Sequence, residues 1–107
     1  RLEQLRTVIE WMESRCSDPS VGMDQIAGVL NLSSRRVNGL FRETFGQSPY
    51  AYFIQLRLRK AKEMLTSSSP LSVREVAERV GFRDASHFIA TFRRHVGMTP
   101  EQFRRLH

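Results

Sequence analysis

The chain has 107 residues and a net charge of +6, with 40% hydrophobic and 26% charged residues, as expected for one globular domain or two small ones. No apolar run approaches the length that crosses a membrane, and the first residues predict a helix rather than a signal peptide. The single cysteine, Cys16, excludes an internal disulfide and fits a reducing, cytoplasmic setting.

Apolar residues at helical spacing run through the first half of the chain, and no segment shows the alternation of a strand. The expected helices are 2–16, 23–30 and 33–45. Asn31 tolerates the left-handed conformation that ends a helix, Ser33 caps the next helix, and Gly46 ends it. The residues expected to face inward are Leu2, Leu5, Val8, Ile9 and Met12 in the first helix, Ile26, Ala27 and Leu30 in the second, and Val37, Leu40, Phe41 and Phe45 in the third.

The second half of the chain opens with a long helix that starts at Ser48-Pro49 and runs to about Leu65. Its expected apolar face is Tyr50, Ile54, Leu58, Ala61 and Leu65. The run Ser67–Pro70 breaks this helix. Two capping boxes, Ser72 with Glu75 and Thr99 with Gln102, open short helices. Between them, Asp84 caps a helix over 84–96 that is bounded by Gly81 and Gly97.

The order of short helix, tight stop, capped longer helix, Gly and Ser/Thr-Pro occurs twice. The paired positions are Ile26-Ala27 with Val76-Ala77, Asn31 with Gly81, Leu32 with Phe82, Phe41-Arg42 with Phe92-Arg93, Gly46 with Gly97, and Ser48-Pro49 with Thr99-Pro100. A small alanine, a short turn and a second helix with one free polar face are typical of a helix-turn-helix unit.

Positive charge comes in two blocks of sequence, each of which includes the second helix of one copy. Residues 32–62 carry seven Lys or Arg against one acid, and residues 82–107 carry five against two. Such basic blocks are typical of nucleic-acid binding. In a helix-turn-helix unit the second helix enters the major groove of DNA.

The chain resembles the DNA-binding region of the AraC/XylS family of bacterial transcription regulators over residues 20–105. The matching stretches are Ile26-Ala27, Asn31-Leu32-Ser33, Arg57–Ala61, Val76-Ala77, Val80-Gly81-Phe82, Phe92-Arg93-Arg94 and Gly97–Arg104. The resemblance implies an all-α fold of about seven helices, with two homeodomain-like helix-turn-helix subdomains. They would be residues 1–47 and 67–107, joined by a linker helix over 48–66.

The resemblance also implies a sequence-specific transcription regulator or activator in the bacterial cytoplasm. Its helices 33–45 and 84–96 would enter successive major grooves of double-stranded DNA, and RNA polymerase would be a further partner. The chain does not begin with Met, so we expect a longer protein, in which any effector ligand binds through a domain absent from this sequence. We expect no cofactor and no membrane contact.

The outward face of the helix 33–45 holds Ser34, Arg35, Asn38, Gly39 and Arg42. Arg pairs with guanine and Asn with adenine, so we assign base reading to Arg35 and Asn38. Arg36 and Arg42 are expected to hold phosphates, which set register without reading sequence. The alternative is a solvated helix face on which arginine only confers solubility.

The outward face of the helix 84–96 offers fewer base-reading groups. Its candidate DNA contacts are Ser86, His87, Ile89 and Ala90, with Arg83, Arg93 and Arg94 as phosphate contacts. Ile89 and Ala90 suit thymine methyl groups. Family members often carry a longer polar side chain where Ala90 stands. His87 and His95, eight residues apart without clustered acids, predict no metal site.

The basic residues of the linker helix either reach phosphates or form a charged solvent face; they are Arg57, Arg59, Lys60 and Lys62.

An enzymatic function is disfavoured, since the sequence has no phosphate-binding loop, serine elbow or metal-ligand cluster. Glu75 and Glu78 share a helix face that fits a solvent-exposed surface. An RNA-binding or protein-interaction module remains a competitor. Two arginine-bearing helices about 34 Å apart on one face would favour DNA over both.

Overall fold

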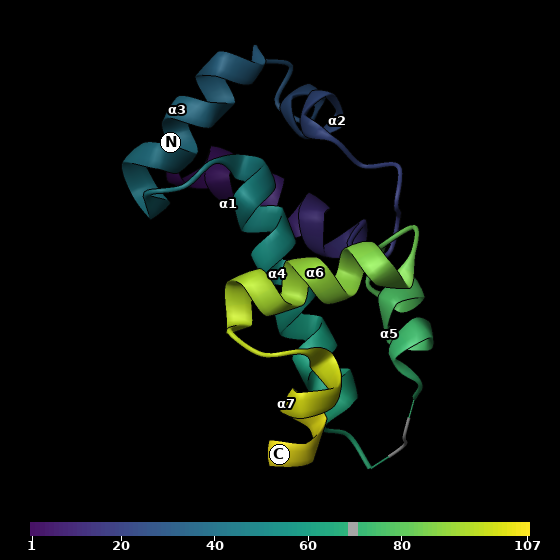
Figure 1. Ribbon diagram of the computed structural model, residues 1–107. Coiled ribbons are helices and arrows are strands. Elements are labelled where there is room, and N and C mark those ends of the chain that lie inside the picture. The colour runs from purple at the N-terminus through teal and green to yellow at the C-terminus, as the bar shows by residue number, and fades with distance from the viewer. Residues whose placement is uncertain (69–70) are drawn as a thin grey trace. The chain divides into compact units, whose positions relative to one another are not determined.

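The computed structural model describes residues 1–68 and 71–107, and seven α-helices lie in these ranges (Figure 1). They are α1 (Leu2–Ser14), α2 (Met23–Gly28), α3 (Ser34–Phe45), α4 (Pro49–Leu65), α5 (Val73–Arg79), α6 (Ala85–Val96) and α7 (Pro100–Leu106). No strand occurs in the described ranges, so the all-α prediction is confirmed. Of the predicted break Ser67–Pro70, residues 69 and 70 lie outside the described residues.

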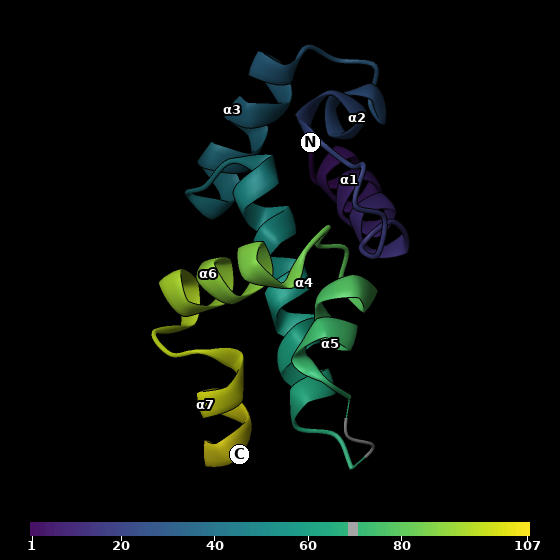
Figure 2. The ribbon, with the colours of Figure 1, turned by 45° about the vertical axis from the view of Figure 1, so that its right-hand side comes forward.

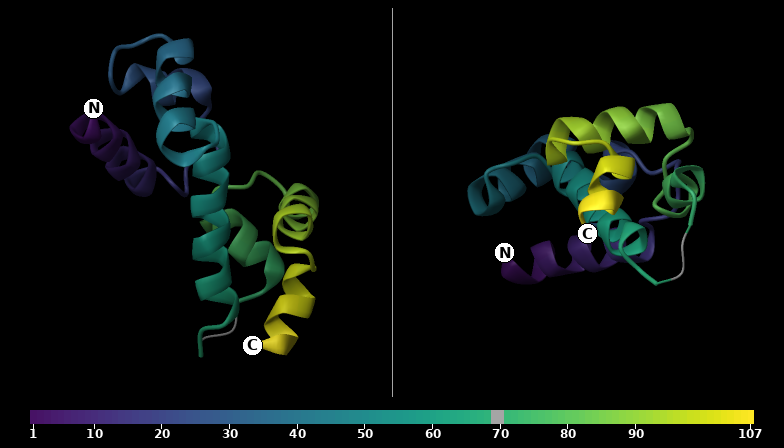
Figure 3. Two further views of the ribbon diagram at one scale, coloured as in Figure 1. Left: turned by 90° about the vertical axis from the view of Figure 1, so that its left-hand side faces the viewer. Right: turned by 60° about the horizontal axis from the view of Figure 1, so that its bottom comes forward.

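The chain divides into two compact units, Arg1–Leu56 and Arg57–His107. The dividing point falls within α4, which is one continuous helix (Figure 3). The first part of α4 therefore belongs to the first unit and the remainder to the second. Apart from α4, the first unit holds α1, α2 and α3, and the second holds α5, α6 and α7.

The first unit is built on a single apolar core to which each of its helices contributes. The buried members are Leu5, Val8, Met12, Cys16, Val21, Ile26, Ala27, Val37, Leu40, Phe41, Phe53 and Leu56. Trp11 and Tyr52 are half-buried against this core, and the Arg15 guanidinium lies 5.7 Å from the Trp11 ring centre. The helical periodicity therefore predicted the inward faces of α1, α2 and α3 in most positions.

Three inward assignments were wrong, and each concerns a residue near a helix end. Leu2 is 78% exposed because it opens α1, ahead of the packed turns. Phe45 and Tyr50 are each 38% exposed, since they flank the turn between α3 and α4. The Phe45 ring still packs on Tyr52, with 4.9 Å between ring centres. In addition, α1 ends at Ser14 rather than at residue 16.

The second unit is organised around a row of phenylalanines. Ring centres are 5.3 Å apart between Phe82 and Phe88, 5.7 Å between Phe88 and Phe92, and 5.7 Å between Phe92 and Phe103. Aromatic rings attract one another in tilted and edge-to-face arrangements at such distances, so these pairs stabilise the unit. The row joins the α5–α6 turn to α6 and α7, which lie with α5 around the second part of α4 (Figure 2). Tryptophan and tyrosine occur only in the first unit.

The same type of turn joins α2 to α3 in the first unit and α5 to α6 in the second. The Leu32 N–H donates to the Ala27 carbonyl at 3.4 Å, and the Phe82 N–H donates to the Ala77 carbonyl at 2.9 Å. Between each pair stands a left-handed residue, Asn31 with φ 55° or Gly81 with φ 90°. This six-to-one bond across a left-handed residue is the Schellman arrangement. The sequence repeat is thus matched by a repeat in the backbone.

The predicted caps form at both ends of α3 and α6. The Ser33 hydroxyl accepts from the Arg36 N–H at 3.1 Å, and the Asp84 carboxylate accepts from the His87 N–H at 2.8 Å. Left-handed glycines end both helices, Gly46 at φ 71° and Gly97 at φ 92°. These local interactions set where α3 and α6 begin and end.

The two predicted capping boxes also form. The Ser72 N–H donates to the Glu75 carboxylate at 2.9 Å, and the Ser72 hydroxyl accepts from the Glu75 N–H at 3.0 Å. The hydrogen bonds from Ser72, with a smaller contribution from Arg79, lower the pKa of Glu75. In the second box the Thr99 N–H donates to the Gln102 side chain at 2.9 Å. Both short helices therefore begin where the sequence predicted.

Among the basic residues of α4, which were expected either to reach phosphates or to form a charged solvent face, Arg57 does neither. Its side chain is buried, at 3% exposure, and its guanidinium lies 5.8 Å from the Phe82 ring centre. A buried arginine forms neither a charged solvent face nor a phosphate contact. Its guanidinium lies beside the aromatic row because planar arginine packs well on rings. Arg59 is exposed, whereas Lys60 and Lys62 are half-buried.

Arg104 of α7 ties together three parts of the second unit. Its guanidinium donates to the carbonyl of Leu65 at 3.4 Å and to the carbonyl of Leu71, and it pairs with Glu101 at 3.2 Å. Leu65 is the last residue of α4, so its carbonyl has no partner within the helix. The arginine supplies donors to backbone acceptors that are partly removed from water.

We predict that Arg104→Met destabilises the second unit by about 1–3 kcal/mol, because the carbonyls of Leu65 and Leu71 lose a donor. Arg105→Met is the matched control, since Arg105 is exposed, and its effect should stay within about 0.5 kcal/mol. Urea denaturation followed by circular dichroism measures both. Equal stability of the two variants would contradict the role given to Arg104.

Thr91 of α6 is 2% exposed, and its hydroxyl has no hydrogen-bond partner among the described residues. An unpartnered buried hydroxyl destabilises the folded state, so Thr91→Val should raise the free energy of unfolding by about 1 kcal/mol. Thr44 of α3 is exposed, and Thr44→Val provides the control with little expected change. Thermal unfolding tests this, and a lowered midpoint for Thr91→Val would refute it.

Candidate nucleic-acid interface

The free face of α3 carries the side chains that the sequence assigned to it. Arg35, Arg36 and Arg42 are exposed, and Ser34 and Asn38 are half-buried. Val37, Leu40 and Phe41 hold the opposite face in the core. The packing therefore leaves one polar face of α3 open to a partner.

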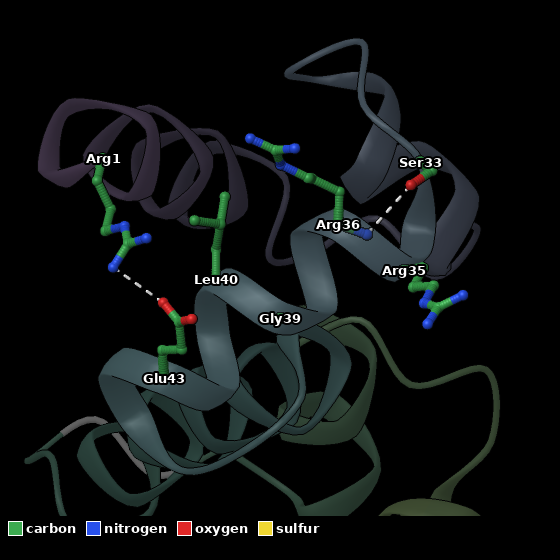
Figure 4. Close-up of a pocket in the computed structure, with 7 residues that line it drawn as sticks. All are labelled: Arg1, Ser33, Arg35, Arg36, Gly39, Leu40 and Glu43. Carbon is green, nitrogen blue, oxygen red and sulfur yellow. Dashed lines mark hydrogen bonds and ion pairs between the residues drawn. The ribbon is translucent and has the colours of Figure 1, made fainter.

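A shallow hollow lies on the first unit between α3 and the start of α1 (Figure 4). Its lining residues are Arg1, Ser33, Arg35, Arg36, Gly39, Leu40 and Glu43. An ion pair of 2.9 Å joins Arg1 to Glu43, and both side chains are mostly exposed. The hollow contains Arg35 and Arg36 from the predicted set, whereas Ser34, Asn38 and Arg42 lie outside its lining.

The free face of α6 is less polar. Ser86, Ala90, Arg93 and Arg94 are exposed, and Ile89 is 37% exposed. A second hollow is lined by Ser86, Ile89, Ala90, Arg93, Arg94 and Thr99. The structure thus brings together five of the residues that the sequence proposed for this helix. Small and apolar side chains form the middle of the surface, with the two arginines beside them.

Arg83 and His87 stand apart from this second hollow. Arg83 is exposed beside the start of α6, in a depression lined also by Arg74, Glu78, Asp84 and Ser86. The His87 ring packs edge-on against Phe82, with 5.4 Å between ring centres. His87 is exposed, its ring packs against Phe82 and it does not line the second hollow, so it lies at the margin of the α6 surface.

The start of α3 favours an anionic partner more than the start of α6 does. The first turn of α3 contains no acid, and the helix dipole makes such an end favourable for phosphate. At the start of α6 the Asp84 carboxylate already accepts from the His87 N–H, and its negative charge opposes a phosphate there. The last turns carry Arg42 in α3 and Arg93 and Arg94 in α6, where cations also stabilise the helix.

Two groups of residues at these surfaces were not assigned from sequence. Arg1 and Glu43 meet across the first unit, forty-two positions apart, so no local pattern could pair them. Thr99 reaches the second hollow from the turn after α6. No cluster of three or more His, Cys, Asp or Glu suited to a metal was found among the described residues.

Among the described helices, none combines the length and the hydrophobicity of a membrane-spanning segment.

The model of a family described as a helix-turn-helix domain matches residues 26–106. The HTH-type transcriptional activator RhaS of Escherichia coli is 34% identical over 101 residues, which are 94% of this chain. The chain spans 36% of the length of RhaS.

Solved structures extend the similarity to the whole fold. An AraC-type transcriptional regulator from Chromobacterium violaceum shares 30% identity and a TM-score of 0.86, over 97% of this chain and 91% of that one. The DNA-binding domain of AdpA, a global transcriptional factor solved in complex with a target DNA, shares 29% identity and a TM-score of 0.86. The match covers 95% of this chain and 90% of the AdpA chain. The chain therefore belongs to the AraC/XylS family of transcription regulators, as an AraC-type helix-turn-helix DNA-binding domain.

Proposed function

We propose that this domain reads a specific double-stranded DNA site by placing α3 and α6 in successive major grooves. The observation that carries the proposal is the repeated unit in which a left-handed turn presents a capped helix with an exposed basic face. The second helix of such a unit docks in the major groove. The related AdpA domain, solved with a target DNA, supports the same use of this fold.

In the first unit, Arg35 and Asn38 are the proposed base readers. Arg35 is exposed in the first turn of α3, and Asn38 follows one turn later on the free face. Bidentate hydrogen bonds suit arginine to guanine and asparagine to adenine. Arg36 and Arg42 would hold phosphates on either side, and Ser34 would add a contact near the helix start.

In the second unit, phosphate contacts would dominate. Arg83, Arg93 and Arg94 are exposed and carry the positive charge of this surface. Ile89 and Ala90 would contact thymine methyl groups, and Ser86 a base or a phosphate. His87 would contribute at the edge, since its ring is directed at Phe82. We therefore expect the part of the DNA site that α3 covers to be specified more sharply.

The wider role we propose is transcription activation in the bacterial cytoplasm, through contact with RNA polymerase and without catalysis. The similarity to RhaS, an HTH-type transcriptional activator, supports this role. The chain spans only 36% of RhaS, so an effector ligand would bind through a separate domain. The proposed division is 1–47 and 67–107 for the two DNA-binding subdomains, with 48–66 as the linker helix.

Selection of bound sites from random double-stranded DNA tests the proposal. We expect a site of two boxes whose centres lie about 10 base pairs apart, one turn of B-DNA. The five arginines proposed to contact phosphates should make the affinity fall roughly 500-fold when the salt concentration rises from 50 to 200 mM. A salt-independent interaction, or a preference for RNA over duplex DNA, would exclude the proposed mode.

The roles of two arginines can be separated on the selected site. Arg35→Ala should relax the preference at one base pair and cost about 1–3 kcal/mol on the preferred site. Arg93→Ala should weaken binding to all sequences alike. It should also reduce the slope of log affinity against log salt concentration by about one, since one phosphate contact is lost. Binding titrations on single-base variants measure both. Uniform weakening by Arg35→Ala would reassign that residue to a phosphate.

A further inference from the structure

Gly39 stands in the middle of α3, on its exposed face, and lines the first hollow. Glycine is unfavourable at such a position, because it lowers helix stability relative to alanine. Its φ is not positive, so the backbone there is one that any residue adopts. The helix itself therefore gives no reason for a glycine at this position.

The surroundings of Gly39 give no reason either. A Cβ atom built at Gly39 would have no heavy atom of the described residues within 4 Å, its chain neighbours and the backbone of its own helix aside. Figure 4 shows the ribbon at Gly39 bare, with Arg35 and Arg36 extending in different directions and Glu43 turned towards Arg1. The first unit thus leaves room for a side chain that the sequence does not supply.

The second unit repeats the feature. Counted at the offset of fifty-one residues that relates the two longer helices, Gly39 corresponds to Ala90, which is also exposed. Both positions line a hollow, together with the corresponding pairs Arg35 and Ser86, and Glu43 and Arg94. Each free helix face therefore carries a very small residue at its centre, with longer side chains around it.

We propose that Gly39 is the point of closest approach between α3 and DNA, where the edge of a base pair lies against its Cα atom. The inference rests on the proposed function. Glycine allows a backbone to approach a ligand more closely than any other residue, and this offsets its cost to the helix. Gly39 then determines specificity through the absence of a side chain, and Arg35 reaches the neighbouring base pair.

Gly39→Ala separates folding from recognition, since the two effects have opposite signs. The added methyl group should raise the melting temperature by about 4 °C, as expected for glycine to alanine in a helix. The same methyl group should collide with the base edge and weaken binding to the selected site about tenfold. Binding to random-sequence DNA at low salt should stay within about twofold of wild type, because phosphate contacts are kept.

Gly28 offers the matched control. It is an exposed helical glycine of α2 with nothing within 4 Å of a built Cβ, and it lies outside the lining of the first hollow. Gly28→Ala should gain stability without loss of affinity. Single-base variants of the selected site should confine the Gly39→Ala loss to one or two adjacent base pairs.

The outcomes are distinguishable. If wild type selects no duplex site, the proposed function fails and the inference fails with it. If wild type selects a site and Gly39→Ala binds it as tightly, only the close approach at Gly39 is refuted. A lowered melting temperature for Gly39→Ala would also refute the inference, because the glycine would then serve the fold.

Discussion

The direction of each exposed helix depends on one backbone hydrogen bond made across a left-handed residue. In the first unit this bond joins Leu32 to Ala27 around Asn31, and in the second Phe82 to Ala77 around Gly81. The last carbonyls of any helix have no partner within that helix, and this bond provides a donor for one of them. The apolar residue that donates the N–H is drawn towards the core, and the next helix leaves at a set angle.

Once that angle is set, packing decides which face of the helix is free. Val37 and Phe41 in α3, like Phe88 and Phe92 in α6, are fully buried, so the exposed positions of both helices can vary without disturbing the core. The two units use this freedom differently. The surface of α3 is rich in charged groups, whereas small and apolar groups form the centre of the α6 surface. One scaffold thus supports two chemistries.

Features determined by neighbours in sequence were predictable, and those determined by distant neighbours were not. The helices, their caps and the left-handed Asn31 follow from local spacing and residue type, and the comparisons confirm the fold and family. The burial of Arg57 depends on Phe82, twenty-five positions away. The Arg1–Glu43 pair likewise joins the start of α1 to α3, forty-two positions along the chain. The exposure of Phe45 follows from its place at the end of α3, which the apolar spacing alone did not reveal. The assignment of individual residues to bases remains a prediction, because it depends on a partner outside the chain.

The division of aromatic residues between the units gives the protein an internal optical label. Its single tryptophan, Trp11, lies against the core of the first unit, and the aromatic row of the second unit is made of phenylalanine alone. Light absorbed at the red edge of the protein spectrum excites tryptophan and not phenylalanine. Emission then reports the surroundings of Trp11 in the core of the first unit, while circular dichroism reports helix content in both units. A difference between the two signals would show one unit opening before the other.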